Sequence, residues 1–316
     1  KIQTLSIQEC LGSCSSNDRC QSVAFCPEFE GCWLKEKSFT GNEPTRDFND
    51  CKTYYKKPCG SSSPTPSPSP APPSPSSTTP PGTSSPLTVT AMTYNTVYTG
   101  YPCCGSNTVP QFGAKIREVG PAVVGAQECQ DANLLASEAG YQVVPGTGPQ
   151  NPILYDPDLA VLIPGSGGWM DVPKDCYAQR TFTWAKFRIA GGSNEFWFFN
   201  THLPHNGCEA QSRDTHAGIA RQLIDQRAQL GAENTPTVVV CDCNPFASGG
   251  SSEGSFESNL ASAGIVKAYE GRGTQGGYAG LDKIFYSSQW TASNGADHGT
   301  GSSDHPAITA DLSFAR

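Results

Sequence analysis

The sequence predicts an α/β (α+β) fold for residues 87–316, arranged as a two-sheet α/β sandwich with helices outside it. Two observations support this prediction. Apolar runs of strand length, such as Val238-Val239-Val240, alternate with longer segments of helical periodicity. Because such a run is apolar on both faces, it needs cover on both sides, either from a second sheet or from helices.

Each expected element follows from the spacing of apolar residues. The longest expected helix spans residues 209–230, where Ile219, Leu223 and Ile224 form an apolar stripe. Two shorter helices are expected at residues 109–119 and 132–139. The expected strands are the apolar runs at residues 87–92, 123–126, 153–155, 196–199, 238–240, 284–285 and 307–310.

Polar side chains stand where these apolar runs end or begin. Carboxylates, amides and imidazoles collected at strand ends are typical of an active site at one edge of a sheet. Asp242 and Asn244 are two residues apart, so their side chains share one face of an extended chain. The complete set is Asn95, Glu128, His202, Asp242, Asn244, Asp282, Asp304 and His305.

The residue types in this set favour metal-assisted attack on a phosphate ester. Asn95 and Glu128 offer hard oxygen ligands, which suit Mg²⁺. His305, next to Asp304, can transfer a proton. Each motif is weak when taken singly, since a Gln-Glu pair after a valine run is more often only a strand end. The prediction depends on six such motifs occurring in this order in one domain-sized segment.

With these motifs, residues 87–316 resemble the endonuclease/exonuclease/phosphatase superfamily, whose members have the deoxyribonuclease I-like fold. The resemblance covers essentially the whole segment. The segment Arg180-Thr181-Phe182-Thr183-Trp184-Ala185 also resembles the approach to the family's Asn-Thr-His-Leu strand. The matching residues are Tyr94-Asn95, Gln127-Glu128, Asn200-Thr201-His202-Leu203, Asp242 with Asn244, Leu281-Asp282-Lys283-Ile284-Phe285 and Ser303-Asp304-His305.

The resemblance implies a metal site and a catalytic histidine. Asn95 and Glu128 would bind one or two Mg²⁺ or Mn²⁺ ions, and Asp304 would lie close to them. His305 would be the catalytic histidine, and Asp282 would orient it. Such a site works by positioning the substrate and by neutralising the charge that develops on the phosphate.

The resemblance also assigns roles near the expected strand at residues 238–240. Asp242 would orient or deprotonate the attacking water, while Asn244 and His202 would hold the phosphoryl oxygens. The family usually has Gly-Asp-[Phe or Ser]-Asn here, whereas this chain has two cysteines flanking Asp242. Cys241 and Cys243 would lie on the strand face opposite Asp242, so we expect them to anchor the strand.

A second departure from the family concerns the partner of His202. Many members have a glutamate shortly before an Ile-Leu-Tyr strand, and it pairs with the histidine in this position. Here the approach to residues 153–155 reads Gly148-Pro149-Gln150-Asn151-Pro152 and contains no carboxylate. The orientation of His202 is therefore open, and a weakened or lost activity is an alternative.

Residues 1–59 form a small unit rich in cysteine. Cys10 and Cys14 are four residues apart, which is expected on one face of a short helix. Short strands are expected at residues 21–25 and 32–35. The pattern C-x3-C-x5-C, followed by a strand and Cys-Trp-Leu, resembles the PAN/apple domain, an extracellular module that binds proteins or carbohydrates. A disulfide-rich domain without a ligand is the alternative.

Residues 60–86 form a linker between these two parts. Of its 27 residues, 10 are Pro, 10 are Ser and 4 are Thr, so it cannot bury a core and favours extended polyproline II. Its Ser-Pro repeats resemble hydroxyproline-rich glycoproteins, which implies O-linked sugars. The candidate glycosylation sites are Ser63, Pro64, Thr65, Pro66, Ser67, Pro68, Ser69, Pro70, Pro72, Pro73, Ser74, Pro75, Ser76, Ser77, Thr78, Thr79, Pro80 and Pro81.

Cysteine usage indicates an oxidising compartment. The chain has 14 cysteines and 2 methionines, with no paired C-x2-C zinc knuckles, so disulfides are expected. Seven cysteines lie in each half, which allows a bridge between domains, a bridge between chains, or a free thiol in each half. We expect a secreted, extracellular protein without a membrane span, because no stretch approaches the roughly 20 apolar residues required.

Charge is unevenly distributed and bears on the substrate. Residues 87–316 hold 13 Lys and Arg against 21 Asp and Glu, so they carry the whole net charge of −8. Such a domain is poorly suited to non-specific capture of a polyanion, which argues against a general nuclease.

The sequence therefore favours a secreted metal-dependent phosphoesterase, acting on a phosphate ester of unknown class, with a binding module at its N-terminus. The alternative is an extracellular structural glycoprotein that assembles into a filament, in which the phosphoesterase fold is a building block. A lectin-like adhesion protein is a third hypothesis, and it depends only on residues 1–59.

Overall fold

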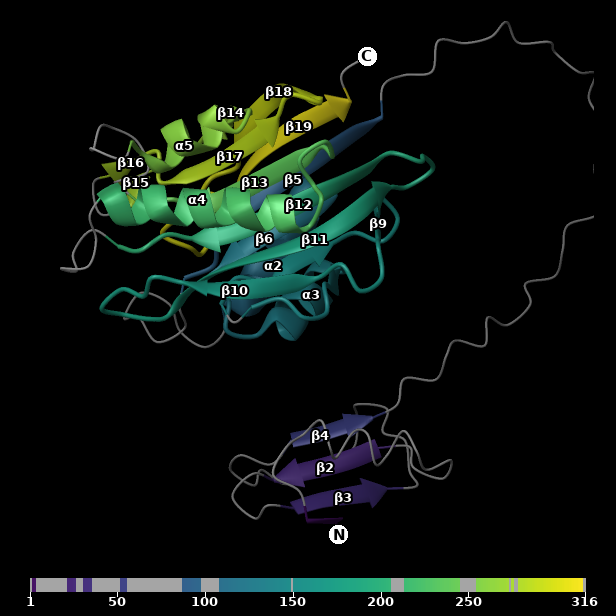
Figure 1. The fold of residues 1–316 in the computed structure, drawn as a ribbon. Coiled ribbons are helices and arrows are strands. Elements are labelled where there is room, and N and C mark those ends of the chain that lie inside the picture. The colour runs from purple at the N-terminus through teal and green to yellow at the C-terminus, as the bar shows by residue number, and fades with distance from the viewer. Residues whose placement is uncertain are drawn as a thin grey trace, which may run out of the picture. The chain divides into compact units, whose positions relative to one another are not determined.

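The chain divides into two compact units, Lys1–Pro80 and Pro81–Arg316, and each is described on its own (Figure 1). The structure is a computed structural model of all 316 residues. The residues that it describes are 2–3, 22–26, 31–35, 52–55, 87–97, 108–148, 150–205, 213–244, 254–272, 274–275 and 278–314.

The first unit contains a four-stranded antiparallel sheet. Its strands are β1 (Ile2–Gln3), β2 (Ser22–Cys26), β3 (Gly31–Lys35) and β4 (Lys52–Tyr55), in the order β1-β3-β2-β4. The two predicted strands correspond to β2 and β3. The helix predicted around Cys10 and Cys14, and the linker with its glycosylation sites, lie outside the described residues, so these features remain predictions.

The second unit is built on two mixed sheets. The first sheet has the order β10-β11-β12-β13-β17-β14, and β9 pairs with β11. These strands are β9 (Ala160–Leu162), β10 (Gly168–Val172), β11 (Arg180–Ile189), β12 (Glu195–His202), β13 (Thr237–Asp242), β14 (Ile265–Glu270) and β17 (Asp282–Ser287).

The second sheet has the order β18-β19-β5-β6-β8-β7. Its strands are β5 (Thr88–Asn95), β6 (Val123–Gln127), β7 (Gln142–Val143), β8 (Ile153–Tyr155), β18 (Trp290–Asp297) and β19 (Ile308–Phe314). A separate two-stranded ribbon joins β15 (Thr274–Gln275) to β16 (Tyr278–Ala279).

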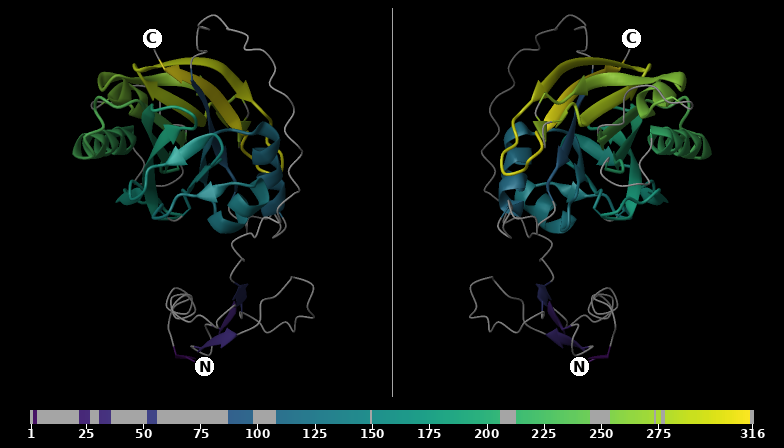
Figure 2. Two further views of the ribbon diagram at one scale, coloured as in Figure 1. Left: turned by 90° about the vertical axis from the view of Figure 1, so that its right-hand side faces the viewer. Right: turned by 90° about the vertical axis from the view of Figure 1, so that its left-hand side faces the viewer.

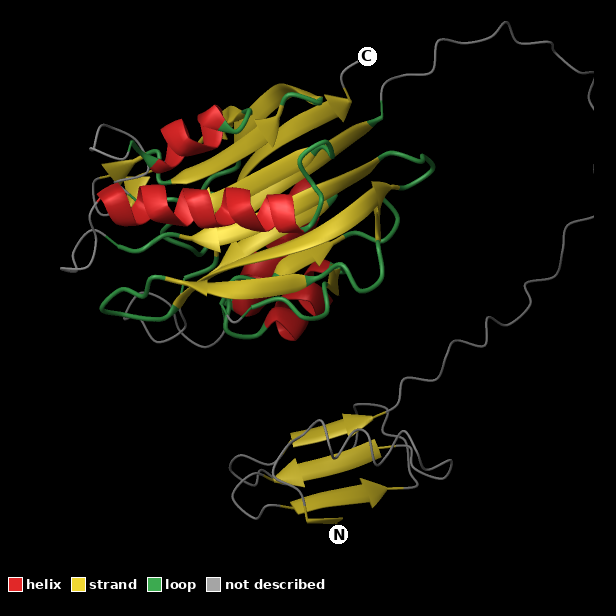
Figure 3. Cartoon of the chain, in the orientation of Figure 1, coloured by secondary structure: helices red, strands yellow, loops and turns green. Residues whose placement is uncertain are grey.

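The two sheets pack face to face, and helices cover their outer faces (Figures 2 and 3). The core between the sheets includes Val123 of β6, Phe198 of β12 and Ile308 of β19. On β13, Val238 and Val240 belong to this inner core, while Val239 belongs to the outer one. Both faces of the strand are covered, which explains its continuous apolar run and confirms the predicted fold class.

Two helices lie on each outer face. Helices α2 (Val109–Val119) and α3 (Ala132–Ala139) contribute Phe112 and Leu135 to the core over the β5 sheet. Helices α4 (Arg213–Gln229) and α5 (Phe256–Ser262) contribute Leu223 and Phe256 to the core over the β12 sheet. The bounds of α2 and α3 are those predicted, and α4 falls within the predicted range 209–230. Helix α5 was not predicted.

Local sequence explains where the shorter helices begin and end. Helix α2 has a proline in its first turn and ends at Gly120, which has the left-handed φ of 66°. Helix α3 begins at Asp131, whose side chain accepts a hydrogen bond from the backbone of Leu134. Helix α5 begins with a capping box in which Ser255 and Ser258 bond reciprocally.

Close contact between the sheets occurs beneath the strand ends. A Cβ added at Gly125 of β6 would lie 2.7 Å from the amide carbon of Asn200 on β12, so only glycine allows this approach. Gln127 Nε2 donates to Asn200 Oδ1 at 2.7 Å, and Asn200 Nδ2 donates to the carbonyl of Ala126 at 2.8 Å. These buried amide contacts tie the two sheets together at one end. Of the helices within the described ranges, none is long and apolar enough to cross a membrane.

Candidate active site

Strand register places three of the predicted residues in one row. Strands β12 and β13 are parallel and pair His202 with Asp242, while β13 and β17 are antiparallel and pair Asp242 with Asp282. Paired residues on neighbouring strands point to the same face of a sheet. Each of the three residues is at most 3% exposed. An imidazole and two carboxylates therefore lie side by side at one edge of this sheet.

The other sheet brings Asn95 and Glu128 to the same place. Strands β5 and β6 are parallel, Asn95 pairs with Gln127, and Glu128 is the next residue. Asn95 Nδ2 donates to Glu128 Oε1 at 3.0 Å and to Asp242 Oδ2 at 2.9 Å. One buried amide thus joins carboxylates that come from both sheets.

The chain turns sharply after these strands. The backbone N–H of Val97 donates to Asn95 Oδ1 at 2.9 Å, and that of Asn244 donates to Asp242 Oδ1 at 3.1 Å. Val97, Glu128 and Asn244 have positive φ values of 51°, 56° and 49°. Residues other than glycine rarely adopt a positive φ, and a β-branched valine does so least of all. The strain is concentrated where the side-chain oxygens must converge.

His305 reaches the site from the segment before β19. Its Nδ1 lies 2.9 Å from Asp282 Oδ2, and its Nε2 lies 3.6 Å from Asp242 Oδ2. Ser303 Oγ donates to the carbonyl of Asn95 at 2.6 Å, which fixes this segment against the end of β5. Asp304 is close enough for its charge to raise the pKa of both His305 and Asp282.

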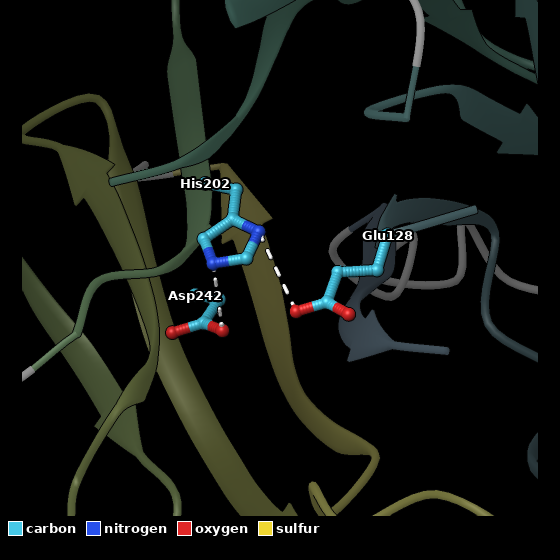
Figure 4. A group of neighbouring side chains, drawn as sticks. All are labelled: Glu128, His202 and Asp242. Carbon is cyan, nitrogen blue, oxygen red and sulfur yellow. Dashed lines mark ion pairs between the residues drawn. The ribbon is translucent and has the colours of Figure 1, made fainter. Parts of the chain in front are cut away.

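His202 lies between Glu128 and Asp242 (Figure 4). Its Nε2 is 3.3 Å from Asp242 Oδ2, and its Nδ1 is 4.0 Å from Glu128 Oε1. A closer neighbour of Nδ1 is Arg180 Nη1, at 2.9 Å. Arg180 in turn forms an ion pair with Asp175, whose Oδ2 accepts from Arg180 Nε at 2.7 Å. The segment at residues 148–152 brings no carboxylate to His202 in the described part of the chain.

The two histidines differ in pKa although they share Asp242 as a neighbour. Burial and the charge of Arg180 lower the pKa of His202 to about 4. Burial acts in the same direction on His305, but Asp282 and Asp242 outweigh it and raise its pKa to about 10. At neutral pH His202 is therefore neutral, while His305 carries a positive charge.

The carboxylates in the row also differ. Burial would raise the pKa of Asp242, but the two imidazoles and the N–H groups of Asn95 and Asn244 lower it to about 2. Burial raises the pKa of Asp282 to about 6 in spite of the attraction of His305. Both carboxylates are ionised at neutral pH, Asp242 far more firmly than Asp282.

Asn244 is held by contacts on both sides of the site. Besides the turn with Asp242, its Nδ2 donates to the carbonyl of Leu203 at 2.9 Å. Leu203 follows His202, and its own N–H donates to the carbonyl of Asp242 at 2.9 Å. The ends of β12 and β13 are thus bound to each other beyond the last paired residues, so Asn244 and His202 keep a fixed separation.

The residues present could hold a metal ion. Glu128, His202 and Asp242 each offer a ligand atom, and these atoms lie within 4.8 Å of one another; the same holds for Asp242, Asp282 and His305. In the first group, two carboxylates that Asn95 now bridges supply hard oxygen donors, and the chemistry of that set fits a divalent cation. The second group contains a charged imidazole, which fits proton transfer better than metal binding.

The structure brings the eight residues predicted from the sequence close to one another, while their catalytic and metal-binding roles remain predictions. Sequence reasoning assigned no role to Arg180 or Asp175. The sequence marks Arg180 only as part of a segment that resembles the family's. The antiparallel pairing of β11 and β12 explains the contact, because it brings the start of β11 beside the end of β12, where His202 lies. Burial of both charged side chains, 7% and 0% exposed, is a further sign of a defined role.

Four cysteines of this unit lie within the described residues, and none of them belongs to the set of side chains that converge at the site. Cys241 and Cys243 form a disulfide, and both belong to the outer core beneath α4 and α5. Cys241 therefore lies on the face of β13 opposite Asp242, and Cys243, just after the end of the strand, packs in the same outer core. Cys176 is also disulfide-bonded, whereas Cys129 is a buried free thiol whose pKa burial raises to about 12. A raised pKa keeps that thiol protonated and unreactive.

Solved structures with the same fold include endonuclease/exonuclease/phosphatase proteins. One from Bacteroides vulgatus matches with a TM-score of 0.60 and 18% identity, over 72% of this chain and 99% of its own. A mannosyl-6-phosphatase from Bacteroides thetaiotaomicron matches with a TM-score of 0.56 and 16% identity, over 72% of this chain and 100% of its own.

The catalytic domain of human Nocturnin, solved with a bound sulfate anion, matches with a TM-score of 0.56 and 16% identity, over 73% of this chain and 94% of its own. No protein-family model matches the sequence, and neither does any curated protein. At these identities the likeness shows the fold. The unit Pro81–Arg316 has the two-sheet architecture of endonuclease/exonuclease/phosphatase proteins.

Proposed function

We propose that the unit Pro81–Arg316 is a metal-dependent phosphoesterase that hydrolyses a phosphodiester or phosphomonoester. The observation that carries this proposal is the row His202–Asp242–Asp282, with His305 bound to Asp282 and with Asn95 and Glu128 facing it from the other sheet. This arrangement brings carboxylates, amides and imidazoles around one point, which supports a site that binds a metal ion and a phosphate ester. Structural neighbours include a phosphatase, which supports the same reaction class.

Each side chain has a defined task in this reaction. Asp242, which stays ionised, orients the attacking water and accepts its proton as the new oxygen–phosphorus bond forms. His305 gives its proton to the leaving oxygen as the old bond to phosphorus breaks. Asp282 keeps the ring of His305 in place through Nδ1. His202 and Asn244 hold the phosphoryl oxygens on the side of β12 and β13.

Mg²⁺ or Mn²⁺ is the proposed cofactor, held by Glu128 and Asn95 with Asp304 nearby. When bound, the ion neutralises negative charge on the phosphoryl group. In the structure Asn95 Oδ1 accepts from Val97 and its Nδ2 faces the two carboxylates. An ion at this place would meet the carboxylate oxygens of Glu128 and Asp242 first, which is the donor type that Mg²⁺ prefers.

Charge favours a small substrate over nucleic acid. The domain at residues 87–316 carries the whole net charge of −8, and a polyanion is normally captured by basic surface. We propose that the enzyme is secreted and that residues 1–59 bind a protein or a carbohydrate. The filament-forming glycoprotein is the alternative, and it depends on residues 60–86, which lie outside the described ranges.

The test is turnover by the full chain of a panel that contains a sugar phosphate, an inositol phosphate, a phospholipid and single-stranded DNA. We expect release of phosphate or of a phosphomonoester with Mg²⁺ or Mn²⁺, and loss of this release when a chelator is added. Glu128→Gln should weaken the response to metal, whereas Glu118→Gln, on the exposed side of α2, should not. Absence of metal-dependent turnover on every substrate would shift the conclusion to the structural glycoprotein.

A further inference from the structure

The two ring nitrogens of His202 face groups of opposite character. Nε2 lies 3.3 Å from a carboxylate oxygen of Asp242, and Nδ1 lies 2.9 Å from Arg180 Nη1. The carboxylate of Glu128 is 4.0 Å from Nδ1, which is beyond hydrogen-bond distance. His305 has the reverse arrangement at Nδ1, where the carboxylate of Asp282 lies at 2.9 Å.

Hydrogen-bond chemistry then fixes where the proton of His202 lies. A guanidinium has five N–H donors and no acceptor, so the contact with Arg180 requires Nδ1 to accept. A neutral imidazole with an accepting Nδ1 carries its proton on Nε2. That proton points to Asp242 Oδ2, which is an acceptor. Both contacts of the ring are satisfied only in this tautomer.

Arg180 is itself held rigidly. Asp175 Oδ2 accepts from Arg180 Nε at 2.7 Å, and Asp175 Oδ1 accepts from the backbone N–H groups of Tyr177 and Ala178 at 2.8 and 2.9 Å. The backbone of His205, three residues after His202, also donates to Asp175 Oδ2 at 3.1 Å. A buried carboxylate thus locks the guanidinium to the turn before β11 and to the segment after β12.

We propose that Arg180 is a positioning residue that fixes the proton of His202 on Nε2. In the free protein this N–H faces Asp242 Oδ2 at 3.3 Å, and with substrate bound it donates instead to a phosphoryl oxygen, so that His202 does not transfer a proton. Proton transfer to the leaving oxygen is then the task of His305 alone. The inference deepens the proposed function and rests on it, because it divides the work of one phosphoesterase site between two histidines. Arg180 here takes the place that a carboxylate would have beside a proton-transferring histidine.

Two substitutions of His202 separate the roles of its two nitrogens. A glutamine amide nitrogen reaches the place of Nε2, whereas an asparagine amide nitrogen reaches only the place of Nδ1. Neither side chain can act as an acid. We expect His202→Gln to bind inorganic phosphate within about 3-fold of wild type and His202→Asn to bind it about 10-fold or more weakly, in calorimetry on metal-loaded full-length protein.

Turnover gives the second readout. His202→Gln should keep kcat/KM within about 10-fold of wild type, while His305→Gln should lose about 10²- to 10⁴-fold. If His202→Gln loses as much as His305→Gln, His202 transfers a proton and the inference is wrong. Equal phosphate binding by His202→Gln and His202→Asn would also overturn it, because the proton on Nε2 would then have no special role.

Arg180 is tested with its partner so that no buried charge is left alone. The pair Asp175→Asn/Arg180→Met removes both charges and nearly keeps their volume, and it should weaken phosphate binding about 10- to 100-fold. Arg180→Lys, which keeps a donor, should recover part of this loss. Arg188→Met, at an exposed position on the same strand, is the matched control and should bind like wild type.

Binding and turnover fail independently in these experiments. Unchanged phosphate binding by Asp175→Asn/Arg180→Met would contradict the role of Arg180, whatever the turnover. A wild-type protein that binds phosphate but turns over no ester would contradict the proposed function, while the order of the binding constants would still decide the inference. Circular dichroism establishes that each variant is folded before either measurement.

Discussion

His202 and His305 show how two copies of one side chain receive different tasks from their surroundings. His202 ends β12 in one sheet, and His305 precedes β19 in the other. Their Nε2 atoms lie 3.3 and 3.6 Å from the same oxygen of Asp242. The difference is at Nδ1, where one meets the guanidinium of Arg180 and the other the carboxylate of Asp282.

A cation at Nδ1 opposes protonation of the ring, and a carboxylate favours it. Burial lowers the pKa of both rings. Together with the charge of Arg180 it brings the pKa of His202 to about 4, whereas Asp282 and Asp242 outweigh burial and raise the pKa of His305 to about 10. Because burial is common to both rings, the charged groups around each ring account for the difference between the two pKa values.

Replacing His305 should have the largest effect. His305→Ala removes the only charged imidazole in the described site, and we expect kcat/KM to fall about 10²- to 10⁴-fold, as for loss of a proton-transferring group. The control is His298→Ala, a partly buried histidine bonded to Thr309 outside the site, which should retain nearly full turnover. Steady-state kinetics on the best substrate of the panel provide the measurement. Equal losses in both variants would contradict the account.

Removing Arg180 alone should destabilise the protein. Arg180→Met leaves Asp175 buried without its ion-pair partner, and such a change typically costs about 3–5 kcal/mol in the free energy of unfolding. Asp175→Asn/Arg180→Met removes both charges and should recover much of that loss. Urea denaturation of the two variants measures the difference. If the double variant is no more stable than the single one, the ion pair does not hold this part of the site.

The residues of the site could be predicted from the sequence to different degrees. Asn95, Glu128 and Asp242 could be predicted because each follows an apolar run, and strand ends are visible in local periodicity. Parallel pairing of β5 with β6 explains why Asn95 and Glu128 lie together, and the face-to-face packing of the two sheets brings them to Asp242. The contact of Arg180 with His202 could not be predicted, because it depends on the register in which β11 pairs with β12, and local periodicity does not reveal that register.

Helix α5 and the neighbour of His202 could not be predicted either. Helix α5 is 7 residues long, too short for a periodic apolar stripe, although its serine capping box was present in the sequence. The missing carboxylate at residues 148–152 was visible as a departure from the family. The sequence did not show which group lies beside His202 in its place, and the structure shows that it is Arg180. Asn151 does not fill that place, because its side chain donates to the carbonyl and hydroxyl of Thr181.

The pH dependence of stability should distinguish His305 from its variant. Because the folded-state pKa of His305 is raised from 6.5 to about 10, protonation stabilises the folded metal-free protein below pH 6.5, and this contribution disappears as the pH rises through 10. Asp282, Asp242 and Asp304 are the charged groups that face the ring. Wild type should therefore lose more stability than His305→Gln between pH 7 and pH 10, by a few kcal/mol at most.

Thermal unfolding of both proteins across that range, in the presence of chelator, measures this contribution. The comparison with His305→Gln removes the effects of lysines and tyrosines, which titrate in both proteins. Parallel stability curves for the two proteins would mean that His305 is not held as a cation by the carboxylates around it.

The most direct test of the contrast between the histidines is the nitrogen NMR spectrum of metal-free protein labelled with ¹⁵N-histidine, at pH 7. His202 should show one protonated nitrogen, Nε2, and one unprotonated nitrogen, Nδ1, while His305 should show two protonated nitrogens. Assignment comes from His202→Gln and His305→Gln, each of which removes one set of signals. A spectrum in which both rings have the same protonation state, or in which His202 carries its proton on Nδ1, would contradict the account.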